Sequence, residues 1–345
     1  TGAYDMDASM EELRELAASA GYESAGILTQ KRPEPDAATC LGAGRLEELA
    51  EFVRNSGADA VIFDHELSPL QIRNLEQQLD RQVIDRTMLI LDIFAQRAVS
   101  AEGKLQVELA QLRYQLPRLA GRGVQLSRQG GGGGCGGGAR RGAGESKKEV
   151  DRRHIQRRIT ALSRQLEELA QRRQRLRERR RKDGVTTVAI VGYTNVGKST
   201  LLNALTQAGV LAEDKLFATL DPTARGLELP DGRRVMLIDT VGLLRRLPHH
   251  LVEAFRSTLE EAAQADLILS VCDAASGEAP QQMAVTRELL AQLGAERLPV
   301  LTVLNKCDLL PELPQGLEGD CVPISARTGA GLPEMGTQSP SSPWG

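Results

Sequence analysis

The stretch VAIVGYTNVGKSTLLNAL, residues 188–205, decides the fold of the second half of the chain. It begins with an apolar run of strand length, turns through two glycines to Lys198 and Ser199, and continues with apolar residues at helical spacing. Gly192 to Ser199 matches the pattern G-x-x-x-x-G-K-S/T. Between a strand and a helix, backbone N–H groups and the positive helix N-terminus surround a phosphate. The stretch predicts a P-loop, and an ordinary glycine-rich turn is the alternative.

Three later motifs argue against an ordinary turn. DTVG, residues 239–242, ends a predicted strand with an acid and continues to a glycine able to contact a γ-phosphate. NKCD, residues 305–308, also ends a strand, and the Asp308 carboxylate can accept hydrogen bonds from N1–H and the 2-amino group of guanine. Adenine offers neither donor, so this motif predicts GTP rather than ATP. SAR, residues 325–327, follows the last strand and is expected to hold guanine O6 through backbone N–H groups.

The strands and helices around these motifs predict a doubly wound, mostly parallel α/β sheet over residues 184–335. Strands are expected at 186–192, 233–240, 266–273, 299–306 and 321–325, and helices near 199–208, 249–265 and 280–295. No closing helix is expected after the last strand, and residues 336–345, which are polar and rich in proline, are predicted to be a disordered tail.

The first 98 residues alternate helix and strand patterns, which predicts a small parallel α/β domain. Strands are expected over 23–30, 58–64 and 82–87. Ser68 and Pro69 have the residue types that begin a helix, at the N-cap and at the first helical position.

Residues 99–183 are predicted to form a long helical hairpin around a glycine-rich loop at about 128–145. Eight of the nine residues from 130 to 138 are glycine, a run too costly in entropy to hold one conformation. Residues 101–182 contain 22 Lys/Arg and 8 Asp/Glu, a net charge of +14, while the rest of the chain carries −17. This asymmetry indicates a polyanionic partner, and a solvated charged helix without a partner is the alternative.

Composition limits the remaining classes of protein. The five cysteines are scattered without C-x-x-C spacing, which argues against a disulfide framework or a zinc site and favours a reducing compartment. No apolar run approaches 18 residues, so no membrane span is expected. The first residues contain neither a basic segment nor an apolar core, so no signal peptide is expected. We predict a cytoplasmic monomer, with peripheral membrane association left open.

Three further segments narrow the class. FATLDPTAR (residues 217–225), DTVGLLRRLPHHLVEAFRSTLEE (239–261) and the glycine loop with its flanking basic residues together resemble the HflX family of ribosome-associated GTPases, whose G domain is related to Obg. The resemblance covers nearly the whole chain. It departs from the family in a longer loop, in Gly142-Ala143-Gly144-Glu145 where the family has Gly-Pro-Gly-Glu, and in Lys147 and Lys148.

The resemblance implies the roles of further residues. It makes Thr219 the second Mg²⁺ ligand beside Ser199, and it makes residues 217–221 a segment that closes over the nucleotide. Asn195 has the position at which potassium-dependent relatives ligate K⁺, and a loop-stabilising asparagine is the alternative. The predicted catalytic residues are Lys198, Thr219 and Gly242. The residues expected to contact GTP are Gly192, Tyr193, Thr194, Asn195, Val196, Gly197, Lys198, Ser199, Phe217, Ala218, Thr219, Leu220, Asp221, Asp239, Thr240, Val241, Gly242, Asn305, Lys306, Cys307, Asp308, Ser325, Ala326 and Arg327.

The residue after Gly242 predicts a slow enzyme. Ras-type GTPases place a water-orienting glutamine there, and this chain has Leu243. His249 and His250 are expected to be surface residues of a switch loop rather than its replacement. Resemblance to the family implies that the large ribosomal subunit and its rRNA complete the site, and that the protein separates stalled or idle ribosomal subunits. An Obg-like assembly GTPase and a non-catalytic, nucleotide-gated RNA-binding module remain the alternatives.

Overall fold

The computed structural model describes residues 6–120, 141–206, 217, 223–229, 232–244, 251, 261–311 and 321–337. The chain divides into two compact units: Thr1–Gln96 with Leu105–Leu166, and Arg97–Lys104 with Glu167–Gly345. The predicted domain limits at residues 98 and 183 differ from this division, because the two helices of the hairpin contribute to both units.

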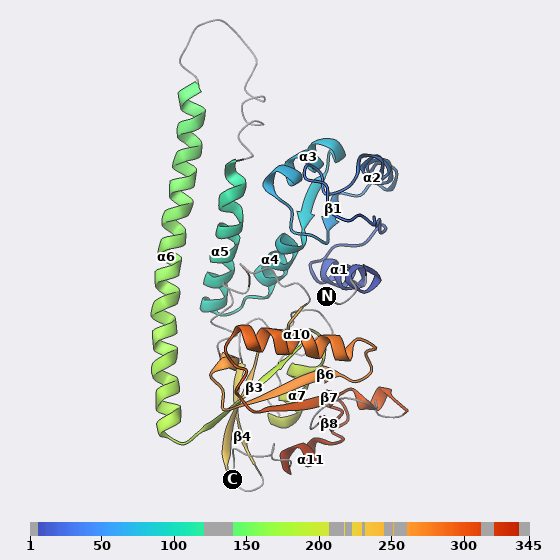
Figure 1. Cartoon of the computed structure of the whole chain (residues 1–345). Helices are drawn as coiled ribbons and strands as arrows, with labels where there is room; N and C mark the ends of the chain where they lie inside the picture. The colour runs from blue at the N-terminus through green and yellow to red at the C-terminus, as the bar shows by residue number, and fades with distance from the viewer. Residues whose placement is uncertain are drawn as a thin grey trace, which may run out of the picture. The chain divides into compact units, whose positions relative to one another are not determined.

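The first unit contains a small parallel α/β fold (Figure 1). Its elements are α1 Met6–Ser19, α2 Ala43–Ser56, β1 Ala60–Phe63, α3 Pro69–Leu79, β2 Gln82–Asp85 and α4 Arg86–Arg97. β1 and β2 pair in parallel, as predicted, with Ala60 opposite Gln82. Leu46, Leu49 and Val53 share one face of α2 and pack into the core of this fold.

The strand predicted over residues 23–30 is wrong, since these residues belong to no sheet. Side-chain hydrogen bonds hold this segment, and one of them takes a backbone carbonyl that a neighbouring strand would use. The Arg45 guanidinium donates to the carbonyl oxygen of Thr29 at 3.0 and 2.6 Å, and Gly42 N–H donates to the Gln30 side chain at 2.9 Å. This part of the chain is therefore held to α2 by side-chain hydrogen bonds instead of a β-ladder.

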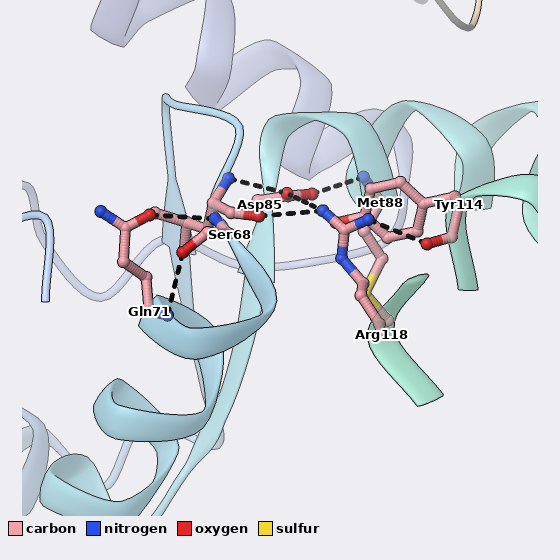
Figure 2. A network of polar contacts seen from close by, with 7 residues as sticks. Ser68, Gln71, Asp85, Met88, Tyr114 and Arg118 are labelled. Atoms are coloured by element: carbon pink, nitrogen blue, oxygen red, sulfur yellow. Dashed lines mark hydrogen bonds and ion pairs between the residues drawn. The ribbon is translucent and has the colours of Figure 1, made fainter. Parts of the chain in front are cut away.

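A buried carboxylate ties the end of β2 to the segment that follows α5 (Ala101–Gln115), as Figure 2 shows. Asp85 is fully buried and accepts hydrogen bonds from Leu67 N–H at 3.0 Å and Met88 N–H at 2.8 Å. Arg118 lies 3.5 Å from the same carboxylate and stacks 3.4 Å from the centre of the Tyr114 ring. Burial and the Asp85 carboxylate both raise the pKa of Tyr114. The Asp85 side chain thus caps the N-terminus of α4 and also neutralises the Arg118 guanidinium of the hairpin.

Figure 2 also shows the predicted start of α3. The Ser68 hydroxyl accepts from Gln71 N–H at 3.2 Å, and the Gln71 side chain accepts from Ser68 N–H at 2.9 Å. Pro69 occupies the first helical position. This reciprocal capping box confirms the helix start predicted from the sequence.

The hairpin consists of α5 Ala101–Gln115, the 3₁₀ turn η1 Leu116–Ala120 and the long helix α6 Arg141–Lys182. Arg158 of α6 pairs with Glu108 of α5 at 2.6 and 2.8 Å, and Arg173 pairs with Glu102. The higher residue number on α6 is paired with the lower residue number on α5, so the two helices are antiparallel, as predicted (Figure 1). The predicted loop ends too late, because helix propagation, which is cheaper than nucleation, carries α6 back through residues 142–145. The glycine run at 130–138 lies outside the described residues.

The second unit contains a six-stranded sheet in the order β4-β5-β3-β6-β7-β8. Its elements are β3 Thr186–Gly192, α7 Lys198–Thr206, β4 Thr223–Glu228, β5 Arg234–Asp239, β6 Leu267–Asp273, α10 Ala279–Gln292, β7 Val300–Asn305, η3 Cys307–Leu309, β8 Cys321–Pro323 and α11 Leu332–Thr337. Every pairing is parallel except that of β4 with β5, which confirms the predicted doubly wound, mostly parallel sheet.

The strand β4 and the helix α11 of this sheet region were not predicted. β4 has the sequence TARGLE, which is poor in β-branched and aromatic residues, and among the described strands it lies at the edge of the sheet, paired with β5. The short helix α11 lies where no closing helix was expected, and it extends to Thr337, into the predicted tail. Within the described ranges, no helix combines the length and apolarity needed to span a bilayer.

We predict that Asp85→Ala destabilises the first unit by about 3 kcal/mol, because it leaves the Leu67 and Met88 N–H groups without their acceptor and removes the carboxylate that pairs with Arg118. Native-state hydrogen exchange of the Val83 and Ile84 amides measures this locally. Ser68→Ala is the control and should cost only about 1 kcal/mol, since it removes a single exposed cap. Equal exchange rates in Asp85→Ala and the parent would contradict this role of Asp85.

Candidate nucleotide site

The predicted P-loop follows β3, the strand between β5 and β6 in the sheet. Two of its positions require glycine. A Cβ on Gly192 would collide with the backbone carbonyl of Val271 on β6. Gly197 has a φ of +92°, and a Cβ there would collide with the side-chain amide of Asn305. The glycines therefore allow neighbouring strand ends to close tightly around the loop.

Lys198 and Ser199 begin α7 and face the acid at the end of β5. Lys198 is 7% exposed, and its Nζ donates to the carbonyl oxygen of Tyr193 at 2.7 Å. Burial lowers its pKa to about 8, against the opposing effect of Asp239. The Ser199 hydroxyl donates to Asp239 Oδ2 at 2.7 Å, and Asp239 is fully buried. A cationic amine, a hydroxyl and a carboxylate thus meet at the carboxyl ends of β3 and β5.

The residues after Asp239 pair with the P-loop through their backbones. Leu243 N–H donates to the Gly192 carbonyl at 3.1 Å, and Thr194 N–H donates to the Leu243 carbonyl at 2.8 Å. Leu243 is 2% exposed, so its side chain is packed into the protein. A buried leucine has no group that could orient water, which agrees with the interpretation of this position from the sequence.

Asn305 joins the P-loop to the loop after β8. Its Nδ2 donates to the Val196 carbonyl at 2.8 Å, and its Oδ1 accepts from Ala326 N–H at 2.9 Å. The residue is 2% exposed and makes both bonds at the end of β7. Three segments far apart in the sequence are therefore linked through one side-chain amide.

The other residues of the NKCD motif lie on the exposed side of this link. Lys306 has a φ of +66°, and its Nζ forms an ion pair with Asp273 at 2.7 Å. Asp308 lies in η3 with an exposed side chain, available to a ligand. Asp273 was not among the predicted site residues, although its place at the carboxyl end of β6 was a signal that could have identified it.

The SAR segment is held in a tight turn. Ser325 is 1% exposed, and its hydroxyl accepts from Thr328 N–H at 3.1 Å. Ala326 N–H already donates to Asn305 Oδ1. A guanine O6 at this loop would therefore share that N–H or use the N–H of Arg327, whose side chain is exposed.

Several predicted site residues fall outside the described part of the chain: Ala218, Thr219, Leu220 and Asp221. His249 and His250, expected at the surface of a switch loop, also lie outside it. Phe217 is described, is buried and has a φ of +56°. Asn195 is exposed with a φ of +61°, a conformation that asparagine tolerates better than most residues. This backbone requirement favours the loop-stabilising role of Asn195, and K⁺ ligation stays a prediction.

The oxygen donors at the site fit Mg²⁺, which prefers hydroxyl and carboxylate oxygens together with substrate phosphates. The Ser199 hydroxyl and the Asp239 carboxylate already lie in hydrogen-bond contact. Across the described ranges no group of three or more His, Cys, Asp or Glu side chains could hold a metal ion by itself. This suits a cation held jointly by one or two side chains and the nucleotide.

The fold and these loops define a P-loop domain for a guanine nucleotide. Three family models match the chain: GTP-binding GTPase N-terminal over residues 7–95, GTP-binding GTPase Middle Region over 97–180, and 50S ribosome-binding GTPase over 187–306. The chain belongs to the HflX family of GTPases, with close relatives of that name in bacteria.

The relatives include GTPase HflX of Caldanaerobacter subterraneus subsp. tengcongensis, which is 55% identical over 327 residues, covering 95% of this chain and 75% of that protein. GTPase HflX of Escherichia coli K12 is 46% identical over 341 residues, covering 96% and 79%. Among solved structures, a complex of SsGBP with GDP is 26% identical, with a TM-score of 0.50, and the match covers 94% of this chain and 92% of that one.

We predict that Asn305→Ala lowers the affinity for GDP about 10- to 100-fold, because it leaves the Val196 carbonyl and the Ala326 N–H without partners. Titration with a fluorescent GDP analogue measures the change. Asn74→Ala is the matched control: it removes an exposed asparagine bonded to the Ala38 carbonyl in the first unit, and it should bind GDP like the parent. Parent-like affinity in Asn305→Ala would show that the link does not shape the site.

Proposed function

We propose that this GTPase works on the large ribosomal subunit in the cytoplasm. The subunit accelerates its hydrolysis of GTP, and the cycle separates stalled or idle ribosomal subunits. The observation that carries the proposal is Leu243, a buried apolar residue where Ras-type enzymes have glutamine. An active site that lacks this group needs a partner to reach a useful rate. The description of the matching G-domain model, 50S ribosome-binding GTPase, supports the choice of partner.

In this proposal Lys198 neutralises the β- and γ-phosphates, and Gly242 N–H contacts the γ-phosphate. Ser199 and Thr219 hold Mg²⁺, which would offset the negative charge of the phosphates. The Asp239 carboxylate accepts from the Ser199 hydroxyl and so orients it. With no water-orienting side chain at Leu243, the lone protein should turn over at about 10⁻⁴ to 10⁻³ s⁻¹, the range of isolated Ras.

A GTPase assay with and without purified large subunits tests this proposal. We expect the subunit to raise the rate at least tenfold, with a further increase in K⁺ over Na⁺ if Asn195 ligates K⁺. Small subunits at the same concentration are the control. Fast turnover by the lone protein, or no response to large subunits, would contradict the requirement for a partner.

We predict that Asp308→Asn weakens guanine nucleotide binding by at least about tenfold and admits xanthine nucleotides. In this proposal the exposed Asp308 carboxylate accepts from guanine N1–H and the 2-amino group, whereas an amide presents a donor to the same edge. Competition of GDP, XDP and ADP against fluorescent GDP measures the selectivity. Asp231→Asn, outside the three motifs, provides the control. Equal GDP and ADP affinities in the parent would refute the assignment of guanine.

The second part of the proposal is that α6 binds rRNA through one face. At 100° per residue, Arg153, Arg157, Arg164, Arg175 and Lys182 fall within about 40° around the helix axis, and all are exposed. We call this set the outer basic stripe; it extends about 43 Å along the helix. Such a row of cations is suited to the phosphates of a nucleic acid.

The opposite face of α6 is used within the protein. Arg158 and Arg173 pair with Glu108 and Glu102, and Arg177 pairs with Glu261 at 2.8 Å. The side chains of Arg173 and Arg177 are only 18% and 19% exposed. Arg173 and Arg177 therefore count toward the net charge of the hairpin but are poorly placed for RNA, whereas Arg158 is exposed and is neutralised by Glu108.

We predict that Arg157, Arg175 and Lys182 changed together to Gln weaken binding to large subunits and flatten its salt dependence. Each lost phosphate contact removes about 0.7–0.9 from the slope of log affinity against log salt. Filter binding at several salt concentrations measures both effects. Arg54, Arg287 and Arg297 changed to Gln remove the same charge from other exposed positions and serve as the control. Equal slopes in the two variants would contradict an RNA-binding role of the stripe.

A further inference from the structure

The P-loop contains a hydroxyl group whose role the proposed mechanism leaves open. Thr194 is 5% exposed, and its Oγ1 has no hydrogen-bond partner among the described residues. A buried hydroxyl without a partner costs free energy. In a binding loop, such a hydroxyl suggests that the bound ligand supplies the missing partner. The Thr194 N–H is already used by the Leu243 carbonyl, which leaves the side chain as the available donor.

The side chain lies where the phosphate-binding groups converge. A Cβ placed on Gly242 would be 2.6 Å from Thr194 Cγ2, 3.0 Å from Thr194 Cα and 3.2 Å from Lys198 Nζ. Gly242 is thus in close contact with both the threonine and the lysine. Burial does not separate Thr194 from the ligand, because the phosphate-binding Lys198 is itself only 7% exposed.

We propose that Thr194 is a catalytic residue whose Oγ1–H donates a hydrogen bond to an oxygen of the γ-phosphoryl group during hydrolysis. The inference rests on the proposed function, because it assumes that GTP is hydrolysed at this P-loop. The transition state spreads charge over the equatorial oxygens of the γ-phosphoryl group, and a fixed donor aimed at them stabilises it. The Leu243 side chain supplies no donor, and Thr194 N–H bonds to the backbone carbonyl of the same residue.

The threonine keeps its proton throughout this reaction. The oxygen of water bonds to the γ-phosphorus, and the bond from that phosphorus to the β–γ bridging oxygen breaks, with its electron pair leaving on GDP. The protons of the water pass to phosphate and solvent. The hydroxyl contributes one hydrogen bond, which is stronger in the transition state than in bound GTP.

The competing explanation is that Thr194 acts only through its shape, with the methyl group packed on Gly242. Two variants separate these roles. Thr194→Val keeps the branched shape and removes the donor. Thr194→Ser keeps the donor and removes the methyl group. The readouts are the single-turnover rate at saturating GTP, with and without large subunits, and the affinity for GDP.

We expect Thr194→Val to lower the single-turnover rate about tenfold or more. Removal of a dedicated oxyanion donor typically lowers the rate by about 10²–10³-fold, which is a larger effect. The GDP affinity of Thr194→Val should stay within about twofold, since GDP has no γ-phosphate, and Thr194→Ser should keep most of the parent rate. The proposal is overturned if Thr194→Val hydrolyses GTP at the parent rate, if it loses GDP affinity as well, or if Thr194→Ser is as slow as the valine variant. A parent chain that hydrolyses no GTP under either condition would instead overturn the proposed function.

Discussion

The side-chain amide of Asn305 is the contact on which the geometry of the nucleotide site depends. It binds the Val196 carbonyl on one side and the Ala326 N–H on the other, so the P-loop and the loop after β8 share one buried anchor. Gly197 lacks a Cβ at the point where this amide approaches, and that absence makes the contact sterically feasible. The shape of the phosphate loop and the position of the base-binding loops are therefore coupled within one unit. A substitution at any of these three places should disturb both halves of the site.

The two faces of the helix α6 have different roles. It ends in a turn at Gly184, where Val185 N–H bonds to the Arg180 carbonyl at 3.1 Å, and β3 with the P-loop follows directly. Its inner arginines are neutralised by acids, including Glu261, which lies between the DTVG motif and β6. Its outer basic stripe is exposed. One helix thus carries the surface proposed to bind RNA and is joined through the backbone to the strand that precedes the phosphate loop.

The sequence predicted the parts of the structure in which local residue types and covalent spacing dominate. The P-loop glycines, the strand-ending Asp239 and Asn305, and the cap at Ser68 all act through residue type at a fixed spacing, and the structure has each of them at the end of the expected strand or helix. The predictions that were wrong or missing concern elements whose structure depends on contacts with distant parts of the chain. Residues 23–30 have a strand-like pattern, yet the Arg45 side chain occupies the Thr29 carbonyl that a ladder would use, and the Gln30 side chain accepts from Gly42 N–H. β4 has weak β-propensity and forms because β5 offers an antiparallel partner.

The net charge of the hairpin likewise predicted only part of what the structure shows. The net charge of the hairpin suggested that its arginines act together, but the sequence does not show which of them meet acids from distant segments, such as Arg177 and Glu261. Helical spacing combined with observed exposure separates an outer set from an inner set. The lack of a water-orienting side chain at Leu243 follows from residue type alone, because an apolar residue has no such group in any environment. The hydroxyl of Thr194 could not be singled out, since its burial and its contact with Gly242 arise only in the folded loop.

The most direct test of the central claim is a sucrose-gradient profile of intact 70S ribosomes incubated with the protein and GTP, a non-hydrolysable GTP analogue, GDP or no nucleotide. We expect GTP or its analogue to convert the 70S peak into separate 30S and 50S peaks, with the protein in the 50S fractions, and GDP to leave the 70S peak intact. A 70S peak that persists under all four conditions would contradict a splitting function, and protein found only on immature large subunits would favour an assembly factor instead.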